Sequence, residues 1–222
     1  MSGAIPTAAR KSRVHHVRSL SEHTYVLRID RGELDFEAGQ YVSVGPKNDL
    51  NMREYSVYSS PSRGDYIEIL VREVAEGYVS RLLRTQEEGD QVLVEGPFGF
   101  FLLDEETRKR PLYFIATGTG ISPFHSFVGS YTDLDYTLLH GIRSAAERYD
   151  YEDYDRGRII CCTSREESGD YHGRVTEWLR ENPVNPDAAC YLCGNCDMIY
   201  EAFDILQEQG VAHDRLFAEV YF

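Results

Sequence analysis

The segment 53–60, REYSVYSS, combines a guanidinium, a phenol ring and a hydroxyl within four positions, at Arg53, Tyr55 and Ser56. In an extended segment alternate side chains share a face, so Arg53 and Tyr55 point one way and Ser56 the other. A guanidinium binds pyrophosphate and a phenol packs against a flat ring, so the segment suits a flat, phosphorylated ligand. Taken alone, these residues are explained more simply by an ordinary strand with an exposed arginine and a half-buried tyrosine.

A glycine-rich turn lies in FIATGTGISPF, residues 114–124. A buried strand leads into Gly118 and Gly120, and Pro123 marks the start of a helix. Glycines let backbone amides approach a phosphate closely, and a helix N-terminus adds a partial positive charge. Strand-to-helix turns use glycine for other reasons as well, so this motif alone leaves nucleotide binding and a plain turn equally open.

Arginines follow two further predicted strands. Ser164 and Arg165 come just after the strand RIICCT, Arg174 lies one loop further on, and Arg143 follows the strand YTLLHG. A hydroxyl beside a planar guanidinium suits a phosphate monoester, such as the 2'-phosphate of NADPH. Any single one of these arginines is explained as well by a solvated surface charge, but their convergence on one sheet edge favours a site.

Three of the five cysteines lie in CYLCGNC, at Cys190, Cys193 and Cys196. Their spacing is that of an iron–sulfur ligand run, but such clusters take four thiolates, and Cys161 and Cys162 belong to a predicted buried strand. We therefore predict no metal, with Cys190 in the core, Cys193 at the mouth of a site and Cys196 at the next turn.

Composition narrows the class of protein. The chain has 222 residues, a formal net charge of −14, no apolar stretch long enough for a membrane span and no apolar signal-peptide core. The charge disfavours nucleic-acid binding, and an odd number of cysteines without a secretory signal indicates reduced thiols. We expect a cytoplasmic protein that binds neither nucleic acid nor membrane, with the acidic run ERYDYEDYD, 147–155, on its solvated surface.

Two patterns divide the chain. From about residue 12 to 103, short alternating segments broken by turn residues predict an antiparallel β-barrel, interrupted by one short helix in GYVSRLLRTQ. After Pro111, buried strands alternate with helices, which predicts an α/β domain with a doubly wound parallel sheet and ligands at the carboxyl ends of its strands. We place the domains at 1–107 and 108–222, with a linker near 104–111.

The motifs follow one another in a recognisable order: Arg53-x-Tyr55-Ser56, a turn and helix from Gly77, GPFGFF, ATGTGISPF, TSRE, YLCGN and a final EVYF. This set resembles the ferredoxin–NADP reductase family over nearly the whole chain, and is most similar to the bacterial ferredoxin/flavodoxin–NADP reductases. The resemblance implies FAD on the barrel domain and NADP on the α/β domain.

By that resemblance, Arg53 would bind the FAD pyrophosphate, Tyr55 would pack on the isoalloxazine and Ser56 would lie near flavin N5. The helix start would also face the pyrophosphate, through Gly77, Tyr78, Val79 and Ser80. Cys193 would stand near nicotinamide C4. The other residues implied for NADP are Thr117, Gly118, Thr119, Gly120 and Gly194 along the nicotinamide and pyrophosphate, and Ser164, Arg165, Arg174 and Arg143 at the 2'-phosphate.

The chain end carries two aromatic residues and an acid. The resemblance implies that Tyr221 covers the flavin ring, that Phe222 contacts the adenine half of FAD, and that Glu219 is a proton or hydrogen-bond partner. A terminal strand that only closes the core is the alternative.

The implied reaction takes a hydride from NADPH to flavin N5 and passes two electrons singly to a ferredoxin or flavodoxin. The sequence lacks the C-x4-C-x2-C run of a ferredoxin, so we expect an external acceptor and a monomeric enzyme. An acidic acceptor would be repelled at long range by a charge of −14. An oxygenase reductase component, a free-flavin reductase and a nucleotide-binding electron-transfer subunit of a larger complex are the alternatives.

Overall fold

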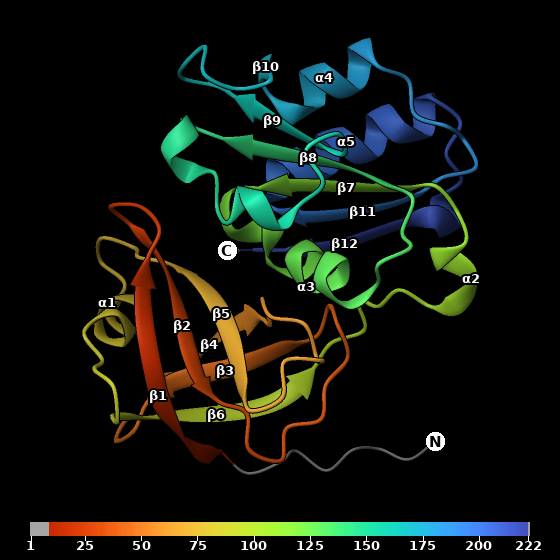
Figure 1. Ribbon diagram of the computed structural model, residues 1–222. Helices are drawn as coiled ribbons and strands as arrows, with labels where there is room; N and C mark the ends of the chain where they lie inside the picture. The colour runs from red at the N-terminus through yellow and green to blue at the C-terminus, as the bar shows by residue number, and fades with distance from the viewer. Residues whose placement is uncertain (1–8, 222) are drawn as a thin grey trace. The chain divides into compact units, whose positions relative to one another are not determined.

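The computed structural model describes residues 9–221, which form two compact units that divide between Leu102 and Leu103 (Figure 1). The sequence analysis placed this boundary at 107/108 and a linker at 104–111. That segment contains a one-turn helix, α2 (Glu105–Arg108), capped by the Asp104 carboxylate, which accepts from Thr107 N at 2.7 Å. The Arg108 guanidinium lies over the Tyr131 ring, 4.5 Å from its centroid, which holds α2 to the rest of the second unit.

The first unit is an antiparallel sheet in the order β4-β3-β6-β1-β2-β5. Its two outer strands also meet, through a bridge between Val57 and Ile69 and a hydrogen bond from Tyr58 N to Glu68 O at 2.7 Å, so the sheet closes on itself. The strands are β1 (Arg10–Ser19), β2 (Thr24–Asp30), β3 (Tyr41–Pro46), β4 (Arg53–Ser56), β5 (Tyr66–Arg72) and β6 (Gln91–Phe98).

Alternating side chains explain why these segments form a barrel. In β6 the residues Val92 and Val94 are fully buried while their neighbours face outward, and the same period of two recurs in β3. One short helix, α1 (Tyr78–Arg84), packs on this core through Val79 and Leu83. The predicted barrel and its single short helix are confirmed.

The second unit is a parallel sheet in the order β10-β9-β8-β7-β11-β12. The chain runs outward from β7 to β10 and then returns to the other side of β7, so the order reverses between β7 and β11. In such sheets this reversal point is where ligands bind. The strands are β7 (Leu112–Thr117), β8 (Tyr136–Ile142), β9 (Ile159–Thr163), β10 (Tyr171–His172), β11 (Ala189–Gly194) and β12 (Leu216–Val220).

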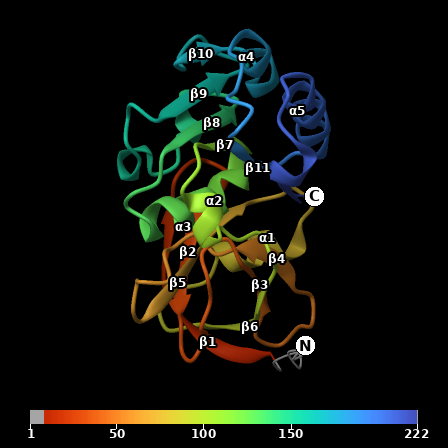
Figure 2. The same ribbon diagram turned by 90° about the vertical axis from the view of Figure 1, so that its right-hand side faces the viewer.

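Helices cover both faces of this sheet (Figures 1 and 2). On one face α3 (Ser122–Ser130) packs through Phe124, which stacks on Phe114 of β7 with ring centroids 4.9 Å apart. On the other face α4 (Val175–Glu181) and α5 (Cys196–Glu208) share an apolar cluster with Ile115 and Leu139. Four short 3-10 helices complete the unit: η1 (Gly118–Ile121), η2 (Ala145–Glu147), η3 (Tyr151–Asp153) and η4 (His213–Arg215).

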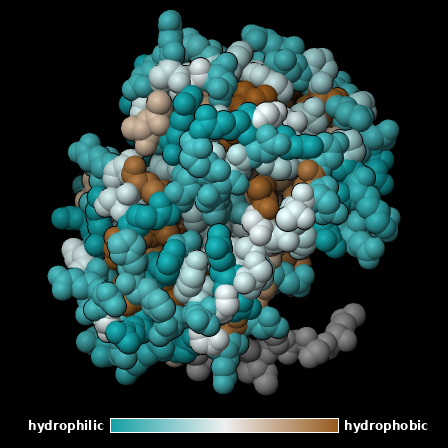
Figure 3. Space-filling model, in the orientation of Figure 1, coloured by the Kyte–Doolittle hydropathy of each residue, from teal (hydrophilic) through white to brown (hydrophobic). Residues whose placement is uncertain are grey.

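The doubly wound parallel sheet expected after Pro111 is confirmed, with one strand that the sequence patterns did not predict, β10, and with β12 at the chain end, where a terminal strand was the alternative. β10 has only two residues, too few to show a period. Hydrophilic residues cover most of the face seen in Figure 3, with hydrophobic side chains in small groups between them. Among the helices of residues 9–221, none has the length and apolar character that a membrane crossing requires.

Candidate functional sites

Arg53, Tyr55 and Ser56 lie together on β4, which pairs with β3 in antiparallel register. Arg53 is exposed, Tyr55 is half-buried against the barrel core and Ser56 is buried. Burial raises the pKa of Tyr55 to about 12, although the Arg53 charge lowers it, so the phenol keeps its proton and can donate. An exposed guanidinium beside a partly open ring suits a flat, phosphorylated ligand.

The segment Gly77–Ser80 opens α1. Gly77 has no side chain to cap the first amides of the helix, and the first turn carries no acidic residue. Ser80 is fixed from two sides, because its carbonyl accepts from the Tyr25 hydroxyl and its Oγ accepts from Val74 N at 3.1 Å. Tyr78 is exposed and lines a groove of ≈ 590 Å³ together with Lys47 and Asn48.

The glycine-rich turn lies at the reversal point of the parallel sheet, directly after β7. Gly118 has φ +53, a conformation that favours glycine, and a β-carbon on Gly120 would lie 2.3 Å from the Cys193 carbonyl oxygen. Gly194 has φ +129, and a β-carbon there would lie 2.3 Å from Thr117 Oγ1. The turn after β7 therefore packs directly against the end of β11, with no room for a side chain at Gly120 or Gly194.

A hydrogen bond fastens the same two strand ends. Thr117 Oγ1 accepts from Asn195 N at 2.9 Å, and the Asn195 side chain caps α5 by accepting from Met198 N at 3.2 Å. The structure thus brings together six predicted residues at one sheet edge: Thr117, Gly118, Thr119, Gly120, Cys193 and Gly194. This cluster, which we call the cradle, suits a phosphate group that approaches the backbone amides of the turn, because its glycines carry no side chains to cover them.

Cys193 is fully buried at the end of β11, beside Glu219 in the register of β12. Burial, and secondarily the Glu219 charge, raise the pKa of the thiol well above its usual range, while a hydrogen bond with Tyr221 lowers it. Tyr221 N donates to Gly194 O at 2.9 Å. Cys193, Glu219 and Tyr221 therefore meet, and Cys193 is a neutral thiol. The predicted contact of Phe222 lies outside the described residues.

The four residues predicted for a phosphate monoester are only partly gathered. Ser164 and Arg174 line one groove of ≈ 480 Å³, whereas Arg165 and Arg143 are exposed beside it, joined by a hydrogen bond from Arg165 N to Arg143 O at 3.2 Å. The groove is also lined by two carboxylates, Glu177 and Glu181. These acids were not predicted, although Arg174, which was predicted, is the N-cap of α4 and Glu177 lies in the first turn of that helix.

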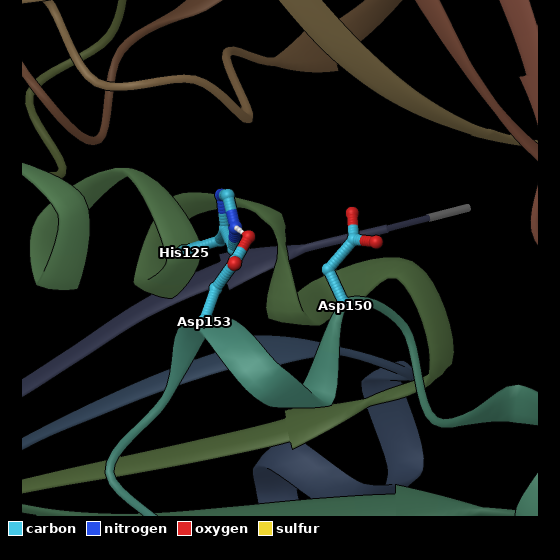
Figure 4. Close-up of side chains that lie close together, drawn as sticks. All are labelled: His125, Asp150 and Asp153. Carbon is cyan, nitrogen blue, oxygen red and sulfur yellow. Dashed lines mark hydrogen bonds and ion pairs between the residues drawn. The ribbon is translucent and has the colours of Figure 1, made fainter.

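The acidic run 147–155 is not simply a solvated surface segment, since Tyr149 and Tyr154 are buried. Its acids face His125 of α3, and Figure 4 shows the His125, Asp150 and Asp153 side chains on neighbouring elements. Their ligand atoms lie within 4.8 Å of one another, and His125 Nε2 lies 3.0 Å from Asp153 Oδ2. The hydrogen bond between His125 and Asp153 fastens the run to α3.

His140 was also missed. It lies in β8, within a run of apolar residues, and its Nε2 lies 2.9 Å from the carbonyl oxygen of Gly118. A histidine in an apolar strand is usually a core residue, so the only sequence signal was one polar residue inside YTLLHG.

Comparison with known proteins identifies both units. The first matches an oxidoreductase FAD-binding domain over residues 11–102, and the second an oxidoreductase NAD-binding domain over residues 114–203. Taken with the two folds, these matches define a two-domain flavoprotein oxidoreductase that uses FAD and a nicotinamide dinucleotide.

The flavodoxin/ferredoxin–NADP reductase of Escherichia coli is 30% identical to this chain, with 84% of this chain and 85% of that protein covered. The anthranilate 1,2-dioxygenase electron transfer component of Acinetobacter baylyi is 29% identical over 92% of this chain, which spans 65% of that protein. A ferredoxin NADP+ reductase from Neisseria gonorrhoeae with bound FAD and NADP has a TM-score of 0.86 at 23% identity, with 97% and 100% coverage. The chain belongs to the ferredoxin–NADP reductase family, as its ordered motifs indicated.

Proposed function

We propose that this protein takes a hydride from NADPH onto FAD and passes electrons singly to a ferredoxin or flavodoxin. The observation that carries the proposal is this cradle, the Gly118–Gly120 turn packed against the Cys193–Gly194 backbone, at the reversal point of an NAD-binding sheet. The bound flavin supplies the change between two-electron and one-electron transfer. The chain supplies binding, orientation and charge.

On the FAD-binding domain, the proposed roles follow from position on β4 and α1. Arg53 pairs with the pyrophosphate, the half-buried ring of Tyr55 packs on the isoalloxazine, and the Ser56 hydroxyl lies near flavin N5. Gly77 and the residues after it, Tyr78, Val79 and Ser80, bring their backbone to the same pyrophosphate.

On the NAD-binding domain, Thr117 to Gly120 and Gly194 line the path of the pyrophosphate and nicotinamide. Cys193 stands near nicotinamide C4 as a neutral thiol, which shapes the pocket and does not act as a nucleophile. Glu219 and Tyr221 adjoin it, and Tyr221 is the residue that we propose to cover the flavin ring.

We propose a preference for NADPH that depends on opposing charges. Ser164, Arg165 and Arg174, assisted by Arg143, attract the 2'-phosphate, while Glu177 and Glu181 repel it. Glu177 is partly committed elsewhere, because its Oε2 accepts from Arg174 N at 2.6 Å. Three guanidinium groups and one hydroxyl against two carboxylates favour the phosphorylated dinucleotide.

The acceptor has two candidates. Relatives named as electron transfer or reductase components of oxygenases favour a second function, delivery of electrons to an oxygenase system. The protein has a net charge of −14, so an acidic ferredoxin or flavodoxin would be repelled at low ionic strength, and salt would screen that repulsion. We propose a monomer that acts in the cytoplasm.

An acceptor assay tests this function. FAD-loaded protein is passed through gel filtration, supplied with NADPH, and offered a [2Fe–2S] ferredoxin, a flavodoxin or free FMN at low and high salt. We expect FAD to be retained and the protein acceptors to be reduced, faster at about 1 M salt than at about 0.1 M. Loss of FAD on the column with efficient reduction of free FMN would show a free-flavin reductase and refute the proposal.

A further inference from the structure

His140 lies beneath the glycine-rich turn. It sits on β8 beside Ala116 of β7 and Cys161 of β9, and its side chain is completely buried. The alternation of β8 puts Leu138 on the same face two residues earlier, and Leu138 is also fully buried. A polar ring occupies a position that the strand otherwise gives to apolar side chains.

The hydrogen bond of this ring defines its tautomer. The Gly118 carbonyl oxygen, 2.9 Å from His140 Nε2, can only accept, so Nε2 carries the hydrogen. Burial lowers the pKa of His140 to about 4, so the imidazole is neutral near pH 7. Among residues 9–221, Nδ1 has no hydrogen-bond partner and is itself buried. The ring thus makes one directed bond, to the turn.

Because the peptide group is planar, this hydrogen bond also fixes the direction of the N–H that follows Gly118. In a trans peptide the carbonyl and the following N–H point in opposite directions, so a Gly118 carbonyl held toward His140 turns Thr119 N–H away from it. The φ of +53 at Gly118 lets the backbone adopt this geometry. The Thr119 carbonyl is held as well, since it accepts from Ser122 Oγ at 2.7 Å.

We propose that His140 is a positioning residue for the dinucleotide pyrophosphate: by holding the Gly118 carbonyl, it presents Thr119 N–H to the phosphate. The inference rests on the proposed binding of the dinucleotide at this turn. It assigns His140 no contact with the ligand and no step of proton transfer.

The segment that covers His140 supports this arrangement. Tyr149 is buried and its ring centroid lies 5.8 Å from that of His140. The same segment is fastened to α3 by the hydrogen bond between His125 and Asp153 (Figure 4). Because α3 follows the turn directly, the cover, the histidine and the turn are held as one assembly.

Three ligands separate a positioning role from a general structural one. ADP-ribose contains the pyrophosphate, 2'-AMP contains only the adenosine and the 2'-phosphate, and NADP+ contains all of them. Binding is measured by calorimetry on FAD-loaded protein, with KM and kcat for NADPH and NADH on the same samples. His140→Leu and His140→Met remove the donor, His140→Gln replaces it, and Leu138→Ala is the control for a damaged core.

We expect His140→Leu and His140→Met to weaken ADP-ribose and NADP+ about ten-fold and to leave 2'-AMP within about two-fold. KM should rise equally for NADPH and NADH with kcat nearly unchanged, and His140→Gln should recover most of the affinity. Leu138→Ala should lower the melting temperature without changing the ratio of ADP-ribose to 2'-AMP affinity.

Unchanged ADP-ribose binding in both apolar variants, or equal losses for ADP-ribose and 2'-AMP, would overturn the role of His140. Failure of the unmodified protein to bind ADP-ribose or NADP+ would instead refute the dinucleotide site itself.

Discussion

The carbonyl oxygen of Cys193 lies only 2.3 Å from where a β-carbon on Gly120 would stand. Gly120 lies in the turn after β7 and Cys193 at the end of β11, on either side of the reversal point, so this approach joins the two strand ends. A glycine is required here for space, in addition to the conformational requirement at Gly118.

Gly120→Ala should therefore damage the dinucleotide site selectively. The added methyl group forces backbone apart from backbone, so we expect NADP+ affinity to fall about ten-fold or more while FAD remains bound. Calorimetry with NADP+ and the flavin absorbance of the same sample measure both. Gly157→Ala is the matched control, because a β-carbon there meets Asp155 only at ordinary contact distance, 3.4 Å. Equal effects of the two variants would contradict the cradle.

Arg165→Ala should reduce discrimination between the two coenzymes. A charge-assisted contact to the 2'-phosphate contributes roughly 1.5–3 kcal/mol, so we expect kcat/KM for NADPH to fall about ten-fold or more and that for NADH to change little. Arg156→Ala, an exposed arginine paired with Glu152, is the control. Equal losses with NADPH and NADH would show that Arg165 supports the loop and does not contact the phosphate.

Tyr221→Ser and removal of residues 221–222 test the proposed ring cover. If Tyr221 and the nicotinamide compete for one stacking surface, both changes should tighten NADP+ binding, blunt the NADPH preference and alter the flavin spectrum. Tyr221→Ser keeps the hydrogen bond from the backbone N of residue 221 to Gly194 O, so it tests the effect of the ring apart from that of the strand. Exposed Tyr200→Ala is the control. A lower melting temperature with an unchanged preference for NADPH would refute the ring cover and show that the chain end only closes the core.

His140 should make the second unit sensitive to acid. The pKa of His140 is about 4 in the folded protein, against its ordinary value of 6.5 in the unfolded chain. As the pH falls, the unfolded chain therefore binds the proton first, and the free energy of unfolding decreases between about pH 6.5 and pH 4. We expect a loss of about 2 kcal/mol between pH 7 and pH 5 that His140→Leu lacks. Trp178, the only tryptophan, reports unfolding of this unit by fluorescence. A pH dependence shared by both proteins would contradict a buried neutral imidazole.

Much of the fold was predictable, because periods of two and buried runs between helices are local properties of the sequence. The cradle was predictable in part: Gly118, Gly120, Cys193 and Gly194 were all identified, since glycines and a strand end carry a visible signal. Their mutual distances were not, because contacts between distant strands depend on sheet order. His140 escaped detection because an imidazole in an apolar run looks like a core residue.

The groove beside Ser164 shows a second kind of limit. One serine and three arginines were identified as a group, but the structure places only Ser164 and Arg174 on its wall and adds Glu177 and Glu181. Arg174 is the N-cap of α4, so Glu177 lies within one turn of a predicted site residue and the sequence carried a signal for it. Glu181 lies at the far end of the same helix, and its place on the groove depends on how α4 packs.

The central claim is that this chain binds FAD and reduces it with NADPH, and an anaerobic titration tests it most directly. Purified protein is loaded with FAD, freed of excess flavin, and titrated with NADPH and separately with NADH while its absorbance spectrum is recorded. The account predicts about one FAD per chain and bleaching of the flavin band by equimolar NADPH, with NADH less effective. A protein that takes up no FAD, or whose flavin stays oxidised with both dinucleotides, would contradict it.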